Sequence, residues 1–540
     1  MPRINIHNGG AVGIVKDTDR PPYTLPPEAW SDGQNVRFVD NKVSKFLGHS
    51  AVFDPPTVAP YWALAVPTST ALYWVYAGLA KVYVHEGGVH TDLTRTSGGD
   101  YSAAASLIWN GGILNGVPIL NNGVDVPQFW ATIDPATKLA NLTNWPAGVT
   151  CDVFRPFKAF GLALGVHKSS GTVHHPHMVK WSHPADPGAV PSSWDETDAT
   201  KDAGETDLTD TDAGIIKDGL ELGNLFIVYK EGSTWAMQFV GGSFIFRFFK
   251  LPWSSGILTK DCVVALPPKG AQKQGSAGHF VATGDDLIVH DGQSIRSLVD
   301  RRWRRWLAAN IDTSNFGRSY CVVNFAQREA WFCFPEVGST WPSLVLAWNL
   351  VDGSVGVRDI ADMSFMAHGP ISETDPTASW DGDADTWADD TTLWNDQLFT
   401  PFVRRLLSCD PTNTKLFQMD NTNQANAVNM SSYVERQGLA IIGRDRQNKP
   451  IVDFSKRKLV HRVWARGAGG PFTIKVGVQE KEDDAVTYSS GMTFDPSSDE
   501  YVDVDPPISG RLITVRFESS ANVAWTISSY DLDIEVLGEF

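Results

Sequence analysis

The stretch LFIVYKEGSTWAMQFVGG, residues 225–242, places two apolar runs on either side of a short polar turn. Its two runs, LFIVY and TWAMQFV, are rich in the β-branched and aromatic residues that favour strands. The residues between them, Lys230 to Ser233, include a glycine and are typical of a tight reversal of the chain. The stretch therefore predicts an antiparallel β-hairpin.

The same strand, turn and strand pattern recurs from residue 71 to about residue 360. It is repeated in ALYWVYAGLAKVYVHEGG (71–88), SLIWNGGILNGVPILNNGV (106–124), HFVATGDDLIVHDGQSIRSL (279–298) and CVVNFAQREAWFCFPEVG (321–338). A hairpin of this size cannot bury its own apolar face, so it must stack on its neighbours, and a closed arrangement leaves few free edges. The pattern predicts a propeller-like or barrel-like platform of hairpin modules.

The C-terminal part alternates apolar and polar residues over several short segments, such as GRLITVRFES (510–519). There Ile513, Val515 and Phe517 share one face of a strand, which is typical of a half-buried sandwich. The sequence thus predicts an all-β chain with an added C-terminal β-sandwich. We expect four parts: an extended docking segment (1–60), the platform (61–371), an acidic insertion or linker (372–400), and the sandwich (401–540), which could also complete the platform.

Composition supports an all-β fold and limits the functional classes. The 540 residues include 47 glycines, 32 prolines and 20 tryptophans, and 42% are hydrophobic, which favours many short strands around a core. The formal net charge of −17 argues against a broad basic face that grips nucleic acid. The five cysteines form no C-x-x-C pair and are expected to be reduced, partly buried thiols. The N-terminus has no signal-peptide pattern and no apolar run is long enough to span a membrane, so we expect synthesis in the cytoplasm without a membrane span.

Catalytic templates are missing from the sequence. There is no G-x-S-x-G, no G-x-x-x-x-G-K-[ST], no H-E-x-x-H and no dinucleotide fingerprint. We therefore predict a protein that is not an enzyme and that needs no cofactor.

Two stretches raise the question of a metal ion, and for both we favour the reading without one. The segment VHHPHMVKWSH (173–183) clusters His174, His175, His177 and His183, but its prolines make it extended and its spacing fixes no further ligand. The segment DGDADTWADD (381–390) begins like a calcium loop, yet Thr386 stands where that loop needs glycine. A solvated acidic loop is the simpler reading, as it is for residues 195–218, which hold nine acidic residues and two lysines.

The segment DRRWRRWLAAN (300–310) concentrates arginines around tryptophans. The arginines could clamp phosphates and the tryptophans could stack on bases, or the segment could be a surface helix or strand edge that pairs with acidic loops of this chain or of a neighbour. Because the chain is acidic, we favour contact with another subunit over contact with DNA. The candidate interaction residues are Arg301, Arg302, Trp303, Arg304, Arg305 and Trp306.

The segment PHMVKWSHPADPGAVPSSWD (176–195) is rich in proline, which fixes φ and disfavours helix. Such an arm is stiff before it binds and loses little entropy on docking. Trp181 and Trp194 would be its anchors, either in this chain's own core or in a neighbouring subunit.

Several of these stretches resemble the tail nozzle (tail tubular or hub) proteins of short-tailed bacteriophages. The resemblance rests on LPPEAWSDGQNVRF (25–38), VYVHEGGVHTDLT (82–94), NNGVDVPQFW (121–130), HMVKWSHPADPGAVPSSWD (177–195), LFIVYKEGSTW (225–235), SGRLITVRFES (509–519) and WTISSYDLDIEVLGE (525–539). It covers most of residues 20–360 and 430–540, and its motifs are structural.

The resemblance implies a virion protein that forms a hexameric ring below the head-to-tail adaptor, with tail fibres or a needle attached and a central channel through which double-stranded DNA leaves. Six copies would carry a formal charge of about −102, and an acidic bore would repel the duplex and let it slide. The family has no catalytic residues to carry over.

Two other functions stay open at this point. One is a carbohydrate-active or carbohydrate-binding propeller of a phage tail, in which tryptophans stack on sugars and two carboxyl groups about 5 to 9.5 Å apart do acid–base work. The other is a host-surface binding module that forms no ring.

Overall fold

The regular secondary structure of the described residues is almost entirely β. A computed structural model describes residues 3–538 except 17–20, 54, 69–70, 107, 211–213, 243, 254, 268–277, 300–301, 372–403 and 448–449. In these described residues the chain forms 44 strands and one α-helix, α1 (Arg304–Asn310), with 3-10 turns at Pro22–Thr24 and Phe316–Arg318. The predicted all-β class is confirmed.

Five consecutive segments of the chain each form a four-stranded antiparallel sheet, here called blades one to five. Blade one comprises β6 (Trp62–Pro67), β7 (Leu72–Ala77), β8 (Val82–Glu86) and β9 (Val89–Asp92). Blade two comprises β10 (Asn110–Leu114), β11 (Val117–Asn121), β12 (Gln128–Phe129) and β13 (Ala140–Asn141). Blade three comprises β14 (Thr150–Phe157), β15 (Phe160–Lys168), β16 (Val173–Trp181) and β17 (Gly204–Asp207). Blade four comprises β18 (Ile216–Leu222), β19 (Leu225–Lys230), β20 (Thr234–Phe239) and β21 (Phe246–Lys250). Blade five comprises β22 (Val263–Leu266), β23 (Gly278–Ala282), β24 (Leu287–His290) and β25 (Ile295–Ser297).

The stretch that predicted a hairpin is the centre of blade four. Strands β19 and β20 pair antiparallel, with Tyr229 opposite Thr234, and the amide of Lys230 donates to the carbonyl of Ser233 at 2.9 Å across the turn. Five of the six residues of β19 are buried, because this strand packs against blades on both of its faces. The alternation expected of a half-exposed strand is therefore replaced by a continuous apolar run.

Two further blades complete the series. Blade six comprises β26 (Tyr320–Asn324), β27 (Glu329–Phe334), β28 (Leu344–Asn349) and β29 (Val355–Asp359). Blade seven comprises β30 (Phe365–Gly369), β31 (Arg405–Asp410), β32 (Lys415–Met419) and, from the other end of the chain, β5 (His49–Val52). The short strands β33 (Gln424–Ala425) and β34 (Val428–Asn429) extend this last sheet beyond β5.

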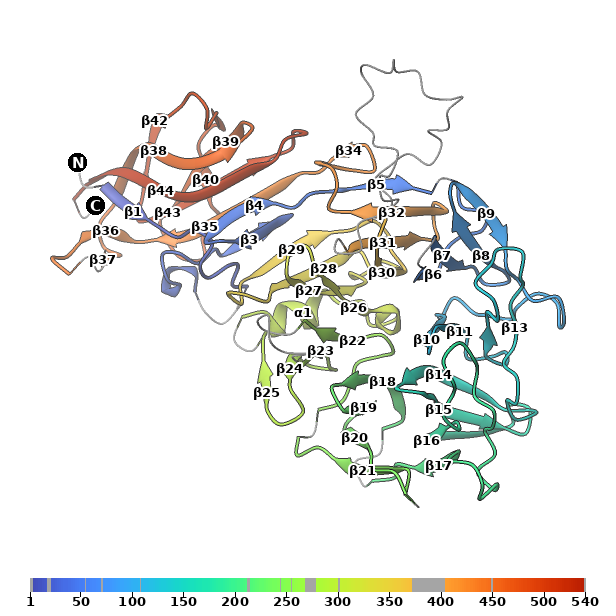
Figure 1. Cartoon of the computed structure of the whole chain (residues 1–540). Helices are drawn as coiled ribbons and strands as arrows, with labels where there is room; N and C mark the ends of the chain where they lie inside the picture. Colours follow the sequence, from blue (N-terminus) through green and yellow to red (C-terminus); the bar gives the residue numbers. More distant parts are fainter. Residues whose placement is uncertain are drawn as a thin grey trace, which may run out of the picture.

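The blades form a closed circle. Each blade touches the next through its first strand, from β6 through β10, β14, β18, β22 and β26 to β30, and β30 touches β6 again. The ribbon follows this circle from blue through green to yellow (Figure 1). Because β5 supplies the outer strand of blade seven, N-terminal residues close the ring. This arrangement leaves only short edges and is that of a β-propeller with seven blades in the described residues.

The N-terminal segment also connects the propeller to a second body. Strands β3 (Val36–Val39) and β4 (Lys42–Lys45) form a hairpin that continues the sheet of blade six, where Val36 lies opposite Val357. On its other side, Val43 of β4 lies opposite Ile527 of β44 (Trp525–Val536). One sheet therefore runs from blade six into the C-terminal part of the chain.

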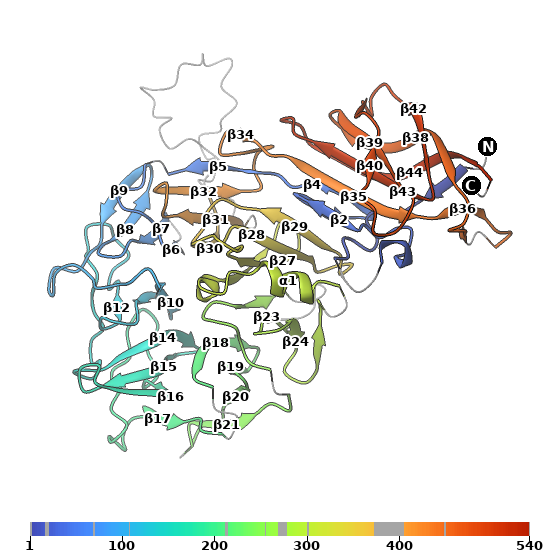
Figure 2. The same ribbon diagram turned by 180° about the vertical axis from the view of Figure 1, so that it is seen from behind.

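The C-terminal part is a sandwich of two sheets, which project beside the propeller together with both termini (Figure 2). The first sheet contains β1 (Arg3–Ile6), β38 (Lys458–Gly469), β42 (Tyr501–Gly510) and β44. The second contains β2 (Asp32–Gln34), β35 (Ser432–Leu439), β39 (Phe472–Gln479), β40 (Thr487–Tyr488), β41 (Met492–Phe494) and β43 (Leu512–Ser519). A separate hairpin joins β36 (Ile441–Arg444) to β37 (Pro450–Val452). Ile513, Val515 and Phe517 are fully buried, as the alternation of β43 predicts.

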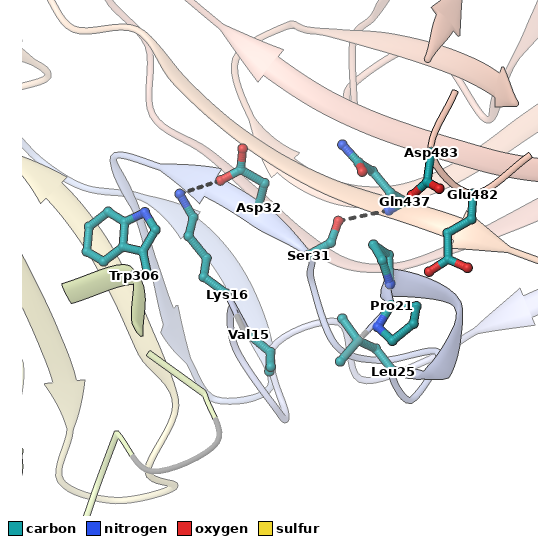
Figure 3. Close-up of a pocket in the computed structure, with 11 residues that line it drawn as sticks. Val15, Lys16, Pro21, Leu25, Ser31, Asp32, Trp306, Gln437, Glu482 and Asp483 are labelled. Carbon is teal, nitrogen blue, oxygen red and sulfur yellow. Dashed lines mark hydrogen bonds and ion pairs between the residues drawn. The ribbon is translucent and has the colours of Figure 1, made fainter. Parts of the chain in front are cut away.

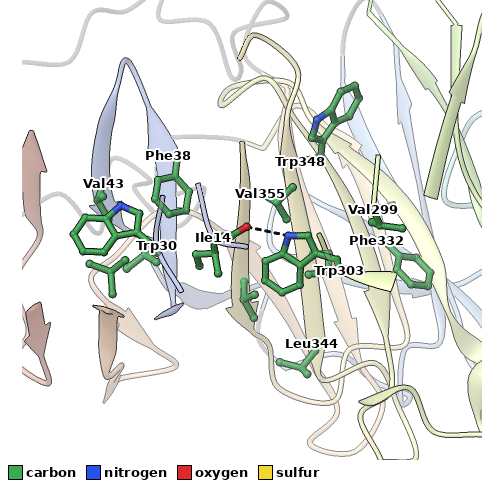
Figure 4. Close-up of a cluster of buried hydrophobic side chains, with 14 of the residues drawn as sticks. Ile14, Trp30, Phe38, Val43, Val299, Trp303, Phe332, Leu344, Trp348 and Val355 are labelled. Atoms are coloured by element: carbon green, nitrogen blue, oxygen red, sulfur yellow. Dashed lines mark hydrogen bonds between the residues drawn. The ribbon is translucent and has the colours of Figure 1, made fainter. Parts of the chain in front are cut away.

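One large core joins the two bodies. It contains Trp30 and Val43 from the N-terminal segment, Phe332 from blade six and Trp303 from the turn before α1. Figure 4 shows Trp30 and Val43 on one side of this core and Trp303 and Phe332 on the other, with the indole of Trp303 directed at the carbonyl oxygen of Ile14. The propeller and the sandwich share buried apolar area, so neither body exposes a full apolar face to solvent at the junction.

The parts differ in extent from those expected. Residues 1–60 are divided between the sandwich, blade six and blade seven, because their short strands fill free edges of sheets made by distant segments. The proposed insertion at 372–400 lies outside the described residues, but its flanking strands β30 and β31 pair with each other. Within 401–540, β31 and β32 belong to the propeller, and the sandwich strands begin with β35.

Candidate functional site at the propeller–sandwich junction

The arginine and tryptophan segment before α1 is divided between core and surface. Trp303 is fully buried, its amide donates to the carbonyl of Val299 at 2.9 Å, and its indole Nε1 donates to the carbonyl of Ile14 at 3.1 Å. Trp306, one turn later, lies half-buried with its ring edge against Trp303 at a centroid distance of 5.1 Å. Trp303 is therefore not available as a platform for bases.

The arginines of this segment face solvent. Arg302, Arg304 and Arg305 are exposed, and Arg301 lies outside the described residues. Arg304 forms an ion pair with Asp285, which lies in the turn between the two central strands of blade five. The surface helix that pairs with an acidic turn of its own chain is one of the two readings that the sequence left open.

A recess lies between α1, the N-terminal segment and the sandwich (Figure 3). Its volume is about 470 Å³. Trp306 and Lys16 form one side, and Glu482 and Asp483 from the loop after β39 lie across from them. Its other lining residues are Val15, Pro21, Pro22, Leu25, Ser31, Asp32 and Gln437.

Several polar groups of the recess already have ion-pair or hydrogen-bond partners. Lys16 Nζ pairs with Asp32 Oδ1 at 2.6 Å and lies 5.0 Å from the centre of the Trp306 ring. The Ser31 hydroxyl donates to the carbonyl of Glu435 at 3.0 Å and accepts from the amide of Gln437 at 2.9 Å. Glu482 and Asp483 are exposed, so the open side of the recess is acidic and favours a cationic occupant.

The proline-rich arm lies against its own chain. Its first part is strand β16, and Trp181 at the end of that strand is half-buried, with Nε1 donating to the carbonyl of Asp202 at 2.8 Å. Trp194 is 1% exposed and packs edge-on against Trp145 at 4.6 Å. Of the two anchoring places considered for these tryptophans, the structure thus shows this chain's own core.

The acidic stretch 195–218 was expected to be a solvated loop, and that expectation is wrong for three of its carboxylates. Asp218 is fully buried and accepts two hydrogen bonds from Arg155, each at 2.8 Å. Asp210 accepts from Lys230 at 2.8 Å, and Glu205 from Lys168 at 2.6 Å. The correction has a simple cause: β17 and β18 run through this stretch, so its carboxylates meet cations on neighbouring strands.

Charged side chains also link blades two to five. Arg155 of blade three bridges Asp218 of blade four and, at 2.7 Å, Asp261 before blade five. The neighbouring Lys260 donates to the carbonyl of Ile108 before blade two, and burial lowers its pKa. These contacts link strands of blades three and four to the segments that lead into blades two and five.

The four histidines of residues 173–183 do not gather at one site in the structure. His183 Nδ1 accepts from the amide of Asp202 at 3.0 Å, while His175 and His177 are half-buried on β16. His174 instead meets Asp152 and His167, two residues that sequence reasoning did not single out. The calcium-like loop 381–390 lies outside the described residues. All five cysteines are buried and unpaired, as expected.

The circle of blades and the shared sheet define a class of protein: a seven-bladed β-propeller joined to a β-sandwich through the N-terminal segment. No family model and no curated protein matches the chain. Among solved structures, the N-terminal domain of Nup159 is similar at 10% identity, with 69% of this chain and 94% of that chain covered and a TM-score of 0.32. A likeness at that score carries no argument, so the class rests on the strand pairing. None of the described helices has the length and apolar character needed to cross a membrane.

Proposed function

We propose that this protein is a non-enzymatic structural subunit of the tail nozzle of a short-tailed bacteriophage. In this proposal copies of the chain form a hexameric ring in the virion, conduct genomic DNA during ejection and dock the adaptor and the fibres or needle. The proposal rests on the way the N-terminal segment joins the two bodies: its strands pair with strands of the sandwich, of blade six and of blade seven. Because one segment pairs with three sheets, no single sheet can separate without breaking contacts to the others. This suits a part that holds its shape under load.

The distribution of charge supports a conduit that does not bind DNA. The chain carries a formal net charge of −17. Several of its arginine and lysine side chains are paired with carboxylates inside the protein. Arg155, Arg358 and Lys230 all lie in buried ion pairs with carboxylates. An acidic exterior gives the duplex few phosphate contacts to form, so it can slide.

The passage in this proposal runs between copies and not through one chain. Contacts of Arg155, Asp218 and Lys260 join blades two to five to one another within one chain. In the proposal the channel is formed by the ring of copies. The acidic recess at the junction would receive a positively charged segment of a neighbouring tail component.

The proposal is tested by mass photometry and cryo-EM of the purified protein, alone and with the head-to-tail adaptor of its virion. We expect a sixfold ring and no retention of duplex DNA at about 0.15 M salt. A protein that stays monomeric with the adaptor, or a ring whose bore is lined by arginine and lysine, would overturn the proposal. Hydrolysis or selective binding of a bacterial glycan would favour the carbohydrate-active alternative instead.

A pair of charge-reversal variants tests whether the recess docks another tail component. Asp483→Lys reverses a charge at its mouth, and Glu500→Lys makes the same change at an exposed position of the sandwich outside the recess. We expect Asp483→Lys to lower the fraction of rings that capture the adjoining tail component, and Glu500→Lys to leave that fraction unchanged.

A further inference from the structure

Three adjacent strands of blade three bring one carboxylate and two imidazoles together. Asp152 is on β14, His167 on β15 and His174 on β16, and the two histidines lie directly opposite each other in the β15–β16 pair. Nε2 of His167 lies 2.9 Å from Asp152 Oδ1, and Nε2 of His174 lies 3.1 Å from Asp152 Oδ2. The two rings stack in parallel, 3.9 Å apart. One ligand atom from each residue lies within 4.8 Å of the other two.

The backbone around this cluster is shaped to hold the carboxylate. The β15–β16 pairing is irregular at Gly165, which has a positive φ of 62°. A Cβ at Gly165 would lie 2.4 Å from Asp152 Oδ2, so the carboxylate uses space that only glycine leaves free. The carbonyl of Asp152 accepts from the Asn110 side chain at 3.1 Å, which anchors this residue independently of the histidines.

Two imidazole nitrogens and a carboxylate oxygen are a common donor set for zinc. Around a tetrahedral zinc with ligand distances of about 2.0 to 2.2 Å, ligand atoms lie about 3.3 to 3.5 Å from one another. The two nitrogens face different oxygens of the Asp152 carboxylate, at 2.9 and 3.1 Å, and one ligand atom from each residue lies within 4.8 Å of the others, so rotation of the side chains would bring three donors to that spacing. His174 is 37% exposed at its side chain, so an ion can enter from solvent and keep a water as its fourth ligand.

We propose that Asp152, His167 and His174 bind a divalent transition cation, with zinc as the preferred ion. To do so both rings turn from their parallel stack so that the Nε2 lone pairs converge, and each neutral ring then carries its single proton on Nδ1. The ion would tie three strands of one blade together where β15 turns into β16. It would therefore stabilise the folded chain by mass action, to a degree set by its concentration.

The test uses the full chain, stripped with EDTA and titrated with zinc chloride in a calorimeter, with thermal unfolding measured in parallel. We expect one equivalent of zinc to bind and to raise the melting temperature by several degrees. His174→Gln and Asp152→Asn should each lower the zinc affinity at least tenfold. The matched control is His461→Gln, because His461 and Glu535 form a histidine–carboxylate pair at 3.1 Å that gathers no third ligand from the part of the chain that the structure describes.

Circular dichroism of the metal-free variants separates loss of the site from loss of the fold, since His174 lies at the surface and its replacement should leave the spectrum unchanged. X-ray absorption of the zinc-loaded protein should show two imidazole ligands. Zinc uptake that is the same in wild type and His174→Gln would overturn the proposal. So would a wild-type chain that binds no zinc, which would leave the cluster as a hydrogen-bonded carboxylate between two imidazoles.

Discussion

The indole Nε1 of Trp303 donates a hydrogen bond of 3.1 Å to the main-chain carbonyl of Ile14, across 289 residues of sequence. Ile14 belongs to the N-terminal segment that enters the sandwich, and Trp303 precedes the only α-helix of the described residues. Both residues are buried in the core shared by the two bodies (Figure 4). The bond therefore fixes the N-terminal segment against the propeller at a place where neither group can reach water.

Trp303→Phe should destabilise the protein because it leaves the Ile14 carbonyl without a donor and shrinks a buried ring. We expect a loss of about 1 to 3 kcal/mol in the free energy of unfolding. Urea unfolding followed by circular dichroism measures it. Trp306→Phe, at a half-buried position next to it, is the matched control and should cost less. Equal midpoints for the two variants would contradict the role given to the hydrogen bond.

A second buried network joins the N-terminal hairpin to blades six and seven. Asp420 accepts from Arg37 at 2.6 Å, from Arg358 at 2.7 Å and from Asn324 at 2.7 Å. Burial by itself would raise the pKa of Asp420, but the two guanidinium groups hold that pKa below its usual range. Asp420 thus contributes stability at pH values above its unfolded pKa of about 3.9, and this contribution is lost as the pH falls further.

Asp420→Asn should therefore be strongly destabilising at neutral pH, because two buried arginines lose their shared carboxylate. The expected cost is about 3 to 5 kcal/mol, measured by urea unfolding at pH 7. Asp503→Asn serves as the comparison, since Asp503 forms an exposed ion pair with Arg462 and should change stability by less than about 1 kcal/mol. A small effect of Asp420→Asn would show that the network is not needed to hold the three parts together.

Tyr229, His279 and His290 form a buried chain of hydrogen bonds between blades four and five. His279 Nε2 donates to the carbonyl of Glu221 at 2.9 Å. The unprotonated Nδ1 of His279 can therefore accept a hydrogen bond from the Tyr229 hydroxyl at 2.7 Å. The Tyr229 oxygen then accepts from His290 Nε2 at 2.6 Å. Burial lowers the pKa of His279 to about 4 and that of His290 to about 3, helped for His290 by its histidine neighbour.

The lowered pKa values of His279 and His290 predict that the folded protein loses stability in mild acid. Above about pH 6.5 they are neutral in both the folded and the unfolded chain and add no pH dependence. As the pH falls from there to about 4, only the unfolded chain takes up these protons, so each histidine costs about 1.4 kcal/mol per pH unit. His290→Gln should reduce the slope of unfolding free energy against pH by about one proton in this interval. An unchanged slope would mean that His290 titrates normally in the folded chain.

The sequence predicts the hairpins well because their signals are local. Lys230 to Ser233 carry the turn chemistry, and the flanking runs carry the strand preference, so β19 and β20 follow from residues that are neighbours in the chain. The closure of blade seven has no such signal. His49 to Val52 are a short polar and apolar mixture, and nothing in them indicates a partner at Leu416 to Met419.

The candidate site shows the same division. The arginines around Trp303 indicate a surface segment, and they do lie at the surface, but the burial of Trp303 depends on Ile14. His174 stood out in its histidine cluster, whereas Asp152 and His167 become its partners only through the register of β14, β15 and β16. Register is set by packing across strands, so such a cluster cannot be found from spacing along the chain.

The pairing of β30 with β31 predicts that residues 372–403 can be exchanged for a short turn. Gly369 lies opposite Arg405, so joining Ile371 to Arg404 through Asn-Gly closes the hairpin with about five residues between these partners, a length that hairpins commonly use. Pro370 must be kept, because its carbonyl accepts from the Trp74 indole at 3.0 Å. We expect the shortened protein to elute as the wild type does in size-exclusion chromatography and to melt at the same or a higher temperature. Leu407→Pro, which breaks the same pair at a buried position of β31, should abolish folding. If the shortened chain fails in the same way as Leu407→Pro, then residues 372–403 take part in building the propeller and are not an insertion between two of its strands.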